Sequence, residues 1–506
     1  MKKYYSYIVI LFTILIFTAF TPVAAEAGVH KGMAGKNAVW KYNMDTKTLT
    51  ITGRGALTSR IKLEDRNLMP VKKIVIKEGI TSIDHFQVFE NVSCEGRPAQ
   101  LVLPDSLKSL ATASFKGLEI SSITIPKNLK DIAPGAFLCW ILEEIHVSPE
   151  NQYFAVEDNV LFSNDKSRLV VYPAGREETV YRVPVSVKKI APLAFALNKY
   201  IKQVVLHKDL RALGAGAFFG CNSLEEINLH QAEKLKKITD FHGYKMGIYL
   251  YNGSELDPDD DPPLYHRIVW TGPGEGVYRE SFDLGTFEGT DISSIRIPDN
   301  VRYMSEDTFK DCFRLREITF GRNFTGEINM EEENRGKSVL LYDLWQLESV
   351  RFAEGNPKYT VRDNIIYSRD GSIIYQVLKK NTTPYFVIEG RVTQIADGAF
   401  YKSETLETVR VKGSLKKIGW SAFAGCGHLF DFLAKGDIDE IGRGAFRQCG
   451  GLESFRCRGY IKRVDAEAFY DCGALREARA ALMPEYVHKT AFGGYSSTLV
   501  RNFIAY

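Results

Sequence analysis

Phenylalanine recurs at a fixed spacing in the C-terminal part of this chain. Five phenylalanines, each preceded by alanine, lie 23 residues apart: Phe400, Phe423, Phe446, Phe469 and Phe492. A unit repeated with a period in the twenties cannot bury its apolar face alone, so successive units must stack on one another. The repeat therefore predicts a solenoid, and it overrides the roughly three or four globular domains that a chain of 506 residues would otherwise suggest.

The full unit is clearest in LRALGAGAFFGCNSLEEINLH, from Leu210 to His230. Its end, L-x-x-I-x-L, alternates as a short strand does, and A-F-x-x-C returns the chain across the far side. Counting degraded copies between Phe241 and Phe287 and near Leu341, we predict about fourteen coils. We expect one continuous buried column of phenylalanines, at positions 115, 137, 195, 218, 241, 287, 309, 400, 423, 446, 469 and 492.

Two segments interrupt the period and match each other. NQYFAVEDNVLFSNDKSRLVVYP starts at Asn151, and NPKYTVRDNIIYSRDGSIIYQV starts at Asn356. Each contains two apolar runs separated by polar turn residues, Asn164-Asp165-Lys166 in one and Arg369-Asp370-Gly371 in the other. This pattern predicts a β-hairpin inserted in the solenoid near 151–175 and another near 356–380.

The N-terminus has the features of an export signal. Lys2 and Lys3 precede an apolar run from Ile8 to Phe20, and small residues follow. We predict a signal peptide over residues 1–25, cleaved after Ala25 or alternatively after Ala27. An uncleaved anchor is the other interpretation, but the run is shorter than the ~20 residues that span a bilayer. The expected location is secreted or at the cell surface.

The cysteines of an exported chain raise the question of disulfides. Five of the eight occupy one repeat slot, three residues after the phenylalanine: Cys221, Cys312, Cys426, Cys449 and Cys472. A slot filled repeatedly by one small residue indicates a buried column of free thiols, because cysteine is among the most buried side chains. A bridge between Cys449 and Cys472 is the alternative, since neighbouring coils lie ~5 Å apart. Without C-x-x-C, no zinc site is expected.

The units I-x-x-x-A-F-x-x-C-x-x-L-x-x-I-x-I-P, as in Ile441 to Cys457 and Met304 to Phe320, closely resemble the BspA-like leucine-rich repeat family of bacterial surface proteins. Trp40 to Leu57 is similar to that family's N-terminal segment. The resemblance implies a β-rich solenoid of the α/β class with a curved parallel sheet on one face, and relatives thought to act in adhesion. It brings no catalytic residues. The domains expected are a β-rich cap at 26–70, the solenoid at 71–495 and a tail at 496–506.

The remaining sequence offers little catalytic chemistry. The balance of 65 Lys+Arg against 62 Asp+Glu gives no argument for nucleic acid or a membrane surface. DPDDDPP at Asp257 spaces carboxylates as a calcium loop does, but Pro262 replaces the required glycine. We interpret 246–283 as a degraded coil with a solvated loop. No cofactor, metal or enzymatic activity is expected. A hydrolase using the acids of this loop is the least favoured function.

A column of arginines supplies the candidate site. In L-x-x-I-x-I the residue between the last two apolar positions points away from the core. That position holds Arg296, Arg351, Arg410, Arg456 and Arg479, interrupted by Thr319 and Leu433. The stripe predicts a non-catalytic module that binds a protein or glycan, an anionic one where the arginines make contact. The alternative is neutralisation by neighbouring carboxylates, with a purely structural role, and four glutamates are candidates: Glu348, Glu407, Glu453 and Glu477.

Overall fold

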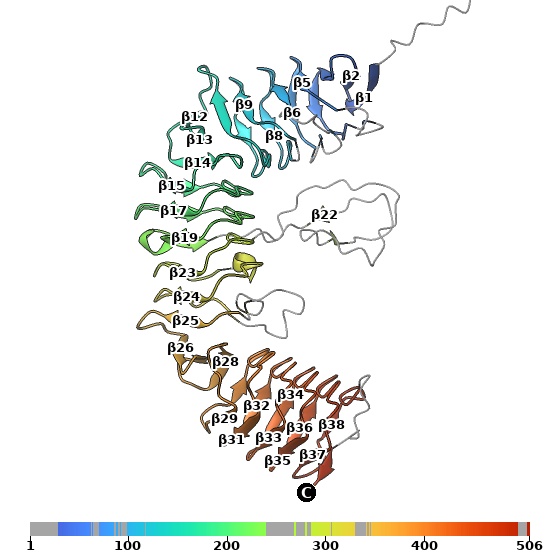
Figure 1. The fold of residues 1–506 in the computed structure, drawn as a ribbon, viewed down its shortest axis with the longest axis vertical. Helices are drawn as coiled ribbons and strands as arrows, with labels where there is room; N and C mark the ends of the chain where they lie inside the picture. Colours follow the sequence, from blue (N-terminus) through green and yellow to red (C-terminus); the bar gives the residue numbers. More distant parts are fainter. Residues whose placement is uncertain are drawn as a thin grey trace, which may run out of the picture. The chain divides into compact units, whose positions relative to one another are not determined.

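The computed structural model describes residues 29–238, 285–328, 346–493 and 503–506, apart from gaps at 62, 64–69, 86–87, 90–91, 93–98, 117 and 305, with residues 341 and 344 and the strands at 268–269 and 279–280. The chain divides into two compact units, residues 1–159 and 160–506. Its coils form a β-solenoid of about 16 turns (Figure 1), which confirms the predicted fold class. The number exceeds the predicted fourteen; Phe89, for example, stacks on Phe115 and fills a slot that was not counted.

The first unit begins with an antiparallel meander. The strands β1 (Val29–Gly35), β2 (Ala38–Asn43) and β3 (Thr48–Gly53) pair in sequence, and β3 then pairs in parallel with β5 (Lys73–Ile76), which pairs with β7 (Gln100–Val102). Leu49 and Ile51 of β3 are fully buried. Six further strands of this unit pair in parallel: β4 (Gly55–Leu57), β6 (Ile80–Ile83), β8 (Ser109–Leu110) and β10 (Asp131–Ile132) in one sheet, β9 (Ser122–Ile125) and β11 (Glu144–Val147) in another.

In the second unit the strands of successive coils pair in parallel and form two sets of sheets. The L-x-x-I-x-I segments form the first set: β15 (Val180–Arg182), β17 (Gln203–Val205) and β19 (Glu226–Ile227); β23 (Ser294–Arg296), β24 (Glu317–Phe320) and β25 (Ser349–Phe352); β29 (Tyr385–Ile388), β31 (Thr408–Val411), β33 (Asp431–Ala434), β35 (Ser454–Cys457), β37 (Glu477–Ala480) and β39 (Ile504–Ala505). We call the outward surface of these strands the strand face.

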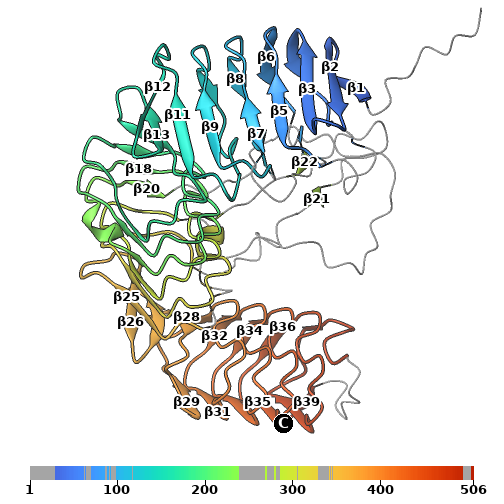
Figure 2. The same ribbon diagram turned by 45° about the horizontal axis from the view of Figure 1, so that its top comes forward.

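The second set precedes the phenylalanine turns and was not predicted as a sheet. It comprises β16 (Lys189–Ile190), β18 (Ala212–Leu213) and β20 (Lys237–Ile238), and further along the chain β30 (Gln394–Ile395), β32 (Leu415–Ile418), β34 (Ile438–Ile441), β36 (Ile461–Val464) and β38 (Tyr486–Val487). Figure 2 shows the C-terminal coils edge-on, with the row β32, β34, β36 separate from the row β29, β31, β35, β39. The short helices η1 (Leu229–Gln231) and η2 (Glu306–Phe309) are also present.

The phenylalanines stack between the two sheets, as their spacing predicts. From Phe400 to Phe492 the ring centroids of successive phenylalanines are 4.6 to 5.3 Å apart. A separate run joins Phe195 to Phe309, with centroids 5.0 to 5.7 Å apart. The expected single column is therefore wrong for this unit, which has two hydrophobic cores. The rings are interrupted because the coils between the two runs carry Leu341 and Val377 at the corresponding positions instead of aromatic residues.

The cysteines line the same interior as free thiols. All five cysteines of the repeat slot are buried and unbridged, as predicted. Each thiol donates a hydrogen bond to the carbonyl of the phenylalanine one coil earlier, for example Cys449 to Phe423 and Cys472 to Phe446, both at 3.0 Å. Cys139 makes the same contact to Phe115 at 3.1 Å, although it stands two residues after its phenylalanine. The slot therefore requires a small side chain that can also donate a weak hydrogen bond.

Both predicted hairpins form. We call β13 (Val160–Ser163) with β14 (Arg168–Val171) the first hairpin, and β27 (Ile365–Ser368) with β28 (Ile373–Val377) the second. The carboxylates of Asp165 and Asp370 organise the predicted turns, each accepting a hydrogen bond from the serine hydroxyl two residues earlier at 2.6 Å. The last strand of each hairpin pairs in parallel with the next coil, so the hairpins are part of the solenoid sheet.

A further strand precedes each hairpin, β12 (Phe154–Glu157) and β26 (Tyr359–Arg362). Asp363 and Asn364 join β26 to β27, and both have positive φ, 50° and 58°. Asp158 and Asn159 have the same signature, with φ of 48° and 61°. A tight hairpin turn with positive φ at both central residues favours Asp and Asn, which explains the D-N pair that both sequence segments share.

No coil lies between the turns that carry Phe218 and Phe287. Phe218 stacks directly on Phe287, with ring centroids 5.7 Å apart, and Gly220 donates a backbone hydrogen bond to Glu288. The degraded coil expected between Phe241 and Phe287 therefore cannot lie between these two turns. Phe241 and the acidic run at Asp257 lie outside the described residues.

Candidate ligand-binding face

Alternation along the strands places the predicted arginines on the strand face. In β31 to β37 the inward positions are fully buried and include Val409, Phe432 and Phe455. Phe432 and Phe455 stack on each other, with ring centroids 5.0 Å apart. Because successive side chains of a strand point to opposite faces, the next residue in each strand faces outward. The packing of the apolar slots thus fixes the orientation of the neighbouring polar side chains.

Parallel pairing aligns the outward positions from coil to coil. Arg410 is in register with Leu433, Leu433 with Arg456, and Arg456 with Arg479. In the sheet of β23 to β25, Arg296 is in register with Thr319 and Thr319 with Arg351. The five arginines therefore occupy the same strand position, with the two interruptions that the sequence predicts, but they lie in two separate sheets, with two arginines in one and three in the other.

Carboxylates pair with the three arginines of the C-terminal sheet. Asp431 accepts hydrogen bonds from Arg410 Nη2 at 2.5 Å and from Arg456 Nη2 at 2.7 and 2.9 Å. The hydrogen bonds that Arg456 donates to Asp431 raise the pKa of its guanidinium. Glu477 pairs with Arg479, which follows it on the same face of β37. Asp431 is 7 % exposed, so it holds both guanidinium groups from below the surface.

Arg296 and Arg351 have a different environment. Both are exposed, and neither makes an ion pair with any residue in the described part of the chain. Their strands are the two neighbours of β24, which places the Cα atoms of the two arginines about 10 Å apart. This pair and the carboxylate-held group of three are therefore two distinct positive surfaces.

An aromatic side chain borders the C-terminal group. Tyr385 is 55 % exposed on β29, and the guanidinium of Arg410 lies 5.8 Å from the centre of its ring. At the other end of the sheet Ile504 and Tyr506 are 52 % and 58 % exposed. Stacking on an aromatic face orients a guanidinium while leaving most of its N–H groups accessible. The face thus combines oriented donors with exposed apolar edges.

The sequence analysis missed Asp431 as the central carboxylate. Of the four glutamates considered, only Glu477 pairs with an arginine of the column; Glu348 contacts Arg316 and Lys380 instead. Glu407 and Glu453 make no ion pair with a described arginine. Asp431 stands two residues before Leu433 on the same face, diagonal to both arginines. Asp431 is recognised as the partner of the arginines when the outward positions of neighbouring strands are compared with one another, and not only those within one strand.

Metal-binding groups, membrane-spanning helices and buried acids are other features that could indicate a function. Among the residues that the structure describes, there is no group of three or more histidine, cysteine, aspartate or glutamate side chains that could hold a metal ion. Across those residues, no helix has the length and apolar character needed to cross a membrane. Asp397 and Glu288 are buried acids, but each belongs to a phenylalanine turn and not to the strands that carry the arginine column.

Comparison with known proteins places the chain in a family. The description "BspA type Leucine rich repeat region" matches in six copies, over residues 66–175, 177–244, 280–330 and 372–498. No curated protein matches. Solved structures with a similar fold include a leucine rich cell surface protein from Faecalibacterium prausnitzii, with 20% identity over 93% of each chain and a TM-score of 0.38.

Two further solved structures are similar at lower identity. A leucine-rich repeat protein from Bacteroides ovatus has 15% identity over 88% of this chain and 93% of its own, with a TM-score of 0.31. The pneumococcal vaccine antigen PcpA has 12% identity over 92% of this chain and 89% of its own, also with a TM-score of 0.31. The repeat, the stacked coils and the extent of the family match together show that the chain belongs to the BspA-type leucine-rich repeat family.

Proposed function

We propose that this chain is a non-catalytic binding protein of the bacterial surface, and that its strand face contacts an anionic protein or glycan. The observation that carries the proposal is the alignment of Arg410, Arg456 and Arg479 in one register column beside the exposed Tyr385. Family membership is consistent with a surface location. A solenoid presents such a column on an extended surface, which suits a long ligand better than a small one.

The internal ion pairs support orientation of the arginines and still leave donors for a ligand. A guanidinium has five N–H groups, and Arg456 uses Nη2 for both of its bonds to Asp431. The Arg410 and Arg456 side chains are 27% and 36% exposed. A carboxylate or sulfate on the ligand would accept from the remaining N–H groups in a bidentate geometry. Asp431 would then act as a support that fixes both side chains before binding.

The test compares two opposite changes of charge on the strand face. The triple variant Arg410→Gln, Arg456→Gln, Arg479→Gln should lose binding to heparin and to an acidic host-protein panel, and the remaining binding should vary less with salt. Asp431→Asn removes a negative charge from the same place, and because its amide oxygen still accepts from the guanidinium groups, anion binding should strengthen. Arg443→Gln with Arg447→Gln is the matched control, because these arginines pair with Glu467 on a phenylalanine turn.

Each variant must be folded for these comparisons, and circular dichroism shows whether it is. If the folded triple variant binds as the original chain does, the arginine column is not the ligand surface. If neither protein binds any member of a glycan and host-protein array, the binding function itself is contradicted.

A structural role as a surface-layer or spacer component is the second candidate. The observation that favours it is the pairing of Asp431 and Glu477 with the three arginines, which neutralises part of the column without any ligand. The partly exposed pair of Glu477 with Arg479 contributes roughly 0 to 1 kcal/mol to stability. If the role is structural, the protein binds no member of the glycan and host-protein array. The triple variant and Asp431→Asn then change only the melting temperature.

Export is part of the proposal. The basic and apolar segments at residues 1–25 support a signal peptide cleaved after Ala25, which would leave Glu26 as the first residue of the secreted or surface-bound protein. N-terminal sequencing of protein recovered from the medium and from the cell surface tests this. Recovery of the intact N-terminus in a membrane fraction would support the uncleaved anchor instead.

A further inference from the structure

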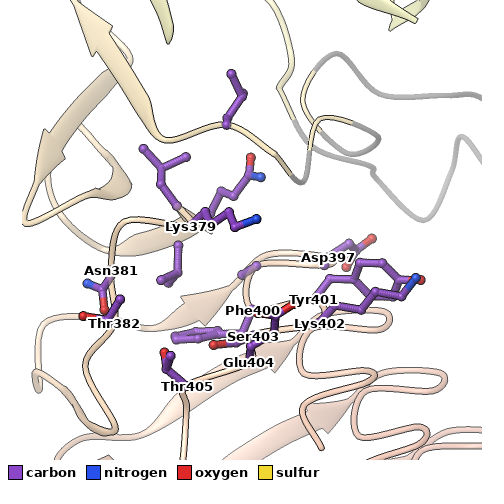
Figure 3. A pocket seen from close by; sticks show the side chains of 16 residues that line it. Lys379, Asn381, Thr382, Asp397, Phe400, Tyr401, Lys402, Ser403, Glu404 and Thr405 are labelled. Carbon is purple, nitrogen blue, oxygen red and sulfur yellow. The ribbon is translucent and has the colours of Figure 1, made fainter. Parts of the chain in front are cut away.

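A cleft of about 450 Å³ opens in the second unit beside the turn that carries Phe400. The segment after β28 forms one side and the phenylalanine turn of the next coil forms the other. Figure 3 shows these sides facing each other, with Lys379 on one and Phe400, Ser403 and Glu404 on the other. Val377, Leu378 and Ala399 add an apolar lining. A cleft of this size accommodates an amino-acid side chain together with part of its backbone.

In the first hairpin copy an aromatic ring occupies the position that corresponds to this cleft. Each hairpin is followed by a backbone hydrogen bond to the next phenylalanine turn, from Tyr172 to Ala194 and from Val377 to Ala399. Tyr172 and Val377 are therefore equivalent residues of the two copies. The ring of Tyr172 is 1 % exposed and stacks on Phe195, with centroids 4.8 Å apart. In the second copy a valine supplies no ring, and the cleft opens at that place.

The side-chain hydrogen bonds that close this position in the first copy are also missing from the second. Asn198 follows Phe195 by three residues, and its amide donates to the carbonyls of Pro173 and Arg176 at 3.0 and 2.9 Å. These bonds hold the segment after Tyr172 against the turn. Ser403 is the equivalent residue and has a side chain too short to make both bonds. The segment after Val377 is instead hydrogen-bonded to the turn before the second hairpin, where the Asn381 amide donates to the Asp363 carbonyl at 2.9 Å.

A buried acceptor gives the site a polar requirement as well. Gln376 lines the cleft, and its Oε1 is buried without a hydrogen-bond partner among the described residues. An unpaired buried oxygen costs free energy, which a donor on an incoming group would recover. A phenol hydroxyl is such a donor, and its ring matches the shape that Tyr172 fills in the first copy.

We infer that this cleft binds an aromatic side chain of a partner polypeptide, a tyrosine in particular, in the position that Tyr172 fills in the first copy. The ring would pack between Val377 and the turn of Phe400, as the ring of Tyr172 packs on Phe195 in the first copy. This site is separate from the arginine column of the strand face and takes a different chemical group. A partner would thus be recognised by one aromatic residue in addition to its charge.

The experiment uses N-acetyl-tyrosine amide as the probe, with N-acetyl-leucine amide for comparison, and follows binding to the purified protein by saturation-transfer NMR. A dissociation constant on the order of 1 mM is expected for a probe of this size. Val377→Tyr places the protein's own ring in the cleft, and Ser403→Asn restores the closing amide from the other side. Each variant should weaken tyrosine binding at least tenfold. The strand-face triple variant should bind the probe unchanged.

The outcomes separate the alternatives. Selective tyrosine binding that is lost in a folded closing variant supports the inference, and Ser403→Asn decides if Val377→Tyr does not fold. Equal binding to the original protein and to a folded closing variant overturns it. A higher melting temperature for Val377→Tyr with no probe binding by the original protein also overturns it, because the cleft is then only a packing defect. Preference for leucine over tyrosine contradicts the aromatic assignment.

Discussion

Phenylalanine and cysteine connect each coil to the next through two different contacts. The rings lie at the spacing of the coils, so one ring per coil fills the interior without gaps, and offset stacking adds to the apolar burial. The thiol three residues later donates to the carbonyl of the preceding phenylalanine, as Cys426 does to Phe400 at 3.0 Å. A buried carbonyl would otherwise lack one of its partners. The repeated A-F-x-x-C frame therefore satisfies both packing and hydrogen bonding.

Truncation of one ring should be expensive. Phe446 is fully buried between Phe423 and Phe469, with ring centroids 5.0 and 5.3 Å away. Phe446→Ala removes these contacts and leaves a cavity, which should reduce the free energy of unfolding by about 3–5 kcal/mol. Thermal melting measures the loss. Phe430→Ala is the matched control, because that ring is 46 % exposed. Equal melting temperatures for the two variants would contradict the register argument.

The thiols should be unreactive in the folded protein. Burial raises the pKa of Cys426 and of Cys472 to about 12, so the nucleophilic thiolate is scarce at neutral pH. Iodoacetamide should label Cys221, Cys312, Cys426, Cys449 and Cys472 only after denaturation, as followed by peptide mass spectrometry. All five should then be modified. Recovery of a peptide that links Cys449 to Cys472 would show that the disulfide alternative is correct.

At the scale of elements, the two hairpins are copies of one device. In each, an aspartate carboxylate closes the turn by accepting from serine side chains and from the backbone: Asp370 accepts from Ser368 Oγ and from the Ser372 N–H at 2.9 Å. A turn built on local side-chain bonds fixes the register of the strands on either side. At the end of β28 the Val377 N–H donates to the Ala399 carbonyl at 2.8 Å, and this contact positions the cleft.

The turn aspartates should titrate at unusually low pH. Hydrogen bonds from Ser368 and Ser372 lower the pKa of Asp370 to about 2, and those from Ser163 and Ser167 lower the pKa of Asp165 to about 2. Because the folded pKa lies below the unfolded value, the stabilising effect is present above about pH 3.8 and is lost as pH falls through 2. NMR titration of the carboxyl carbons measures this. A midpoint near 3.8 for both residues would refute the predicted hydrogen bonding.

At the scale of the second unit, two hydrophobic cores follow each other along the solenoid. One contains Phe195 to Phe309 and the other Phe400 to Phe492. In a repeat protein each coil contacts its neighbours, so stability is approximately a sum of coil and interface contributions. Damage in one core should therefore remain largely local. The strands of Arg410, Arg456 and Arg479 and the Val377 side of the cleft both pack on the second core, so a loss of that core would affect both sites.

Native-state hydrogen exchange can measure this locality. Phe218→Ala should accelerate amide exchange in the coils around β17 and β18, because Phe218 is fully buried against Phe195 and Phe287. Exchange in β31 to β37 should stay within about twofold of the original protein, since contributions from distant sites add independently. A uniform acceleration across both cores would show that the unit unfolds as a single cooperative block.

The sequence by itself determined the repeated parts of this protein. When one residue type recurs at the same position of many coils, that position must have the same environment in each coil. The burial of Phe423 and Cys449 and the outward position of Arg456 could therefore be assigned from spacing and alternation alone. The same holds for the hairpins, whose turn residues carry local signals in Asp165 and Asp370. The physical reason is that these features depend on contacts within a coil or between identical positions of adjacent coils.

Only the tertiary structure decided the features that break the repeat. The stacking of Phe218 on Phe287 shows that these two turns are direct neighbours, whereas their spacing in the sequence also allowed a degraded coil between them. The pairing of Asp431 with two arginines depends on which residues three adjacent strands place side by side. The cleft at Val377 exists because a ring and an amide present in one copy are absent from the other. Such features depend on contacts between non-equivalent positions, and a repeating pattern holds no information about them.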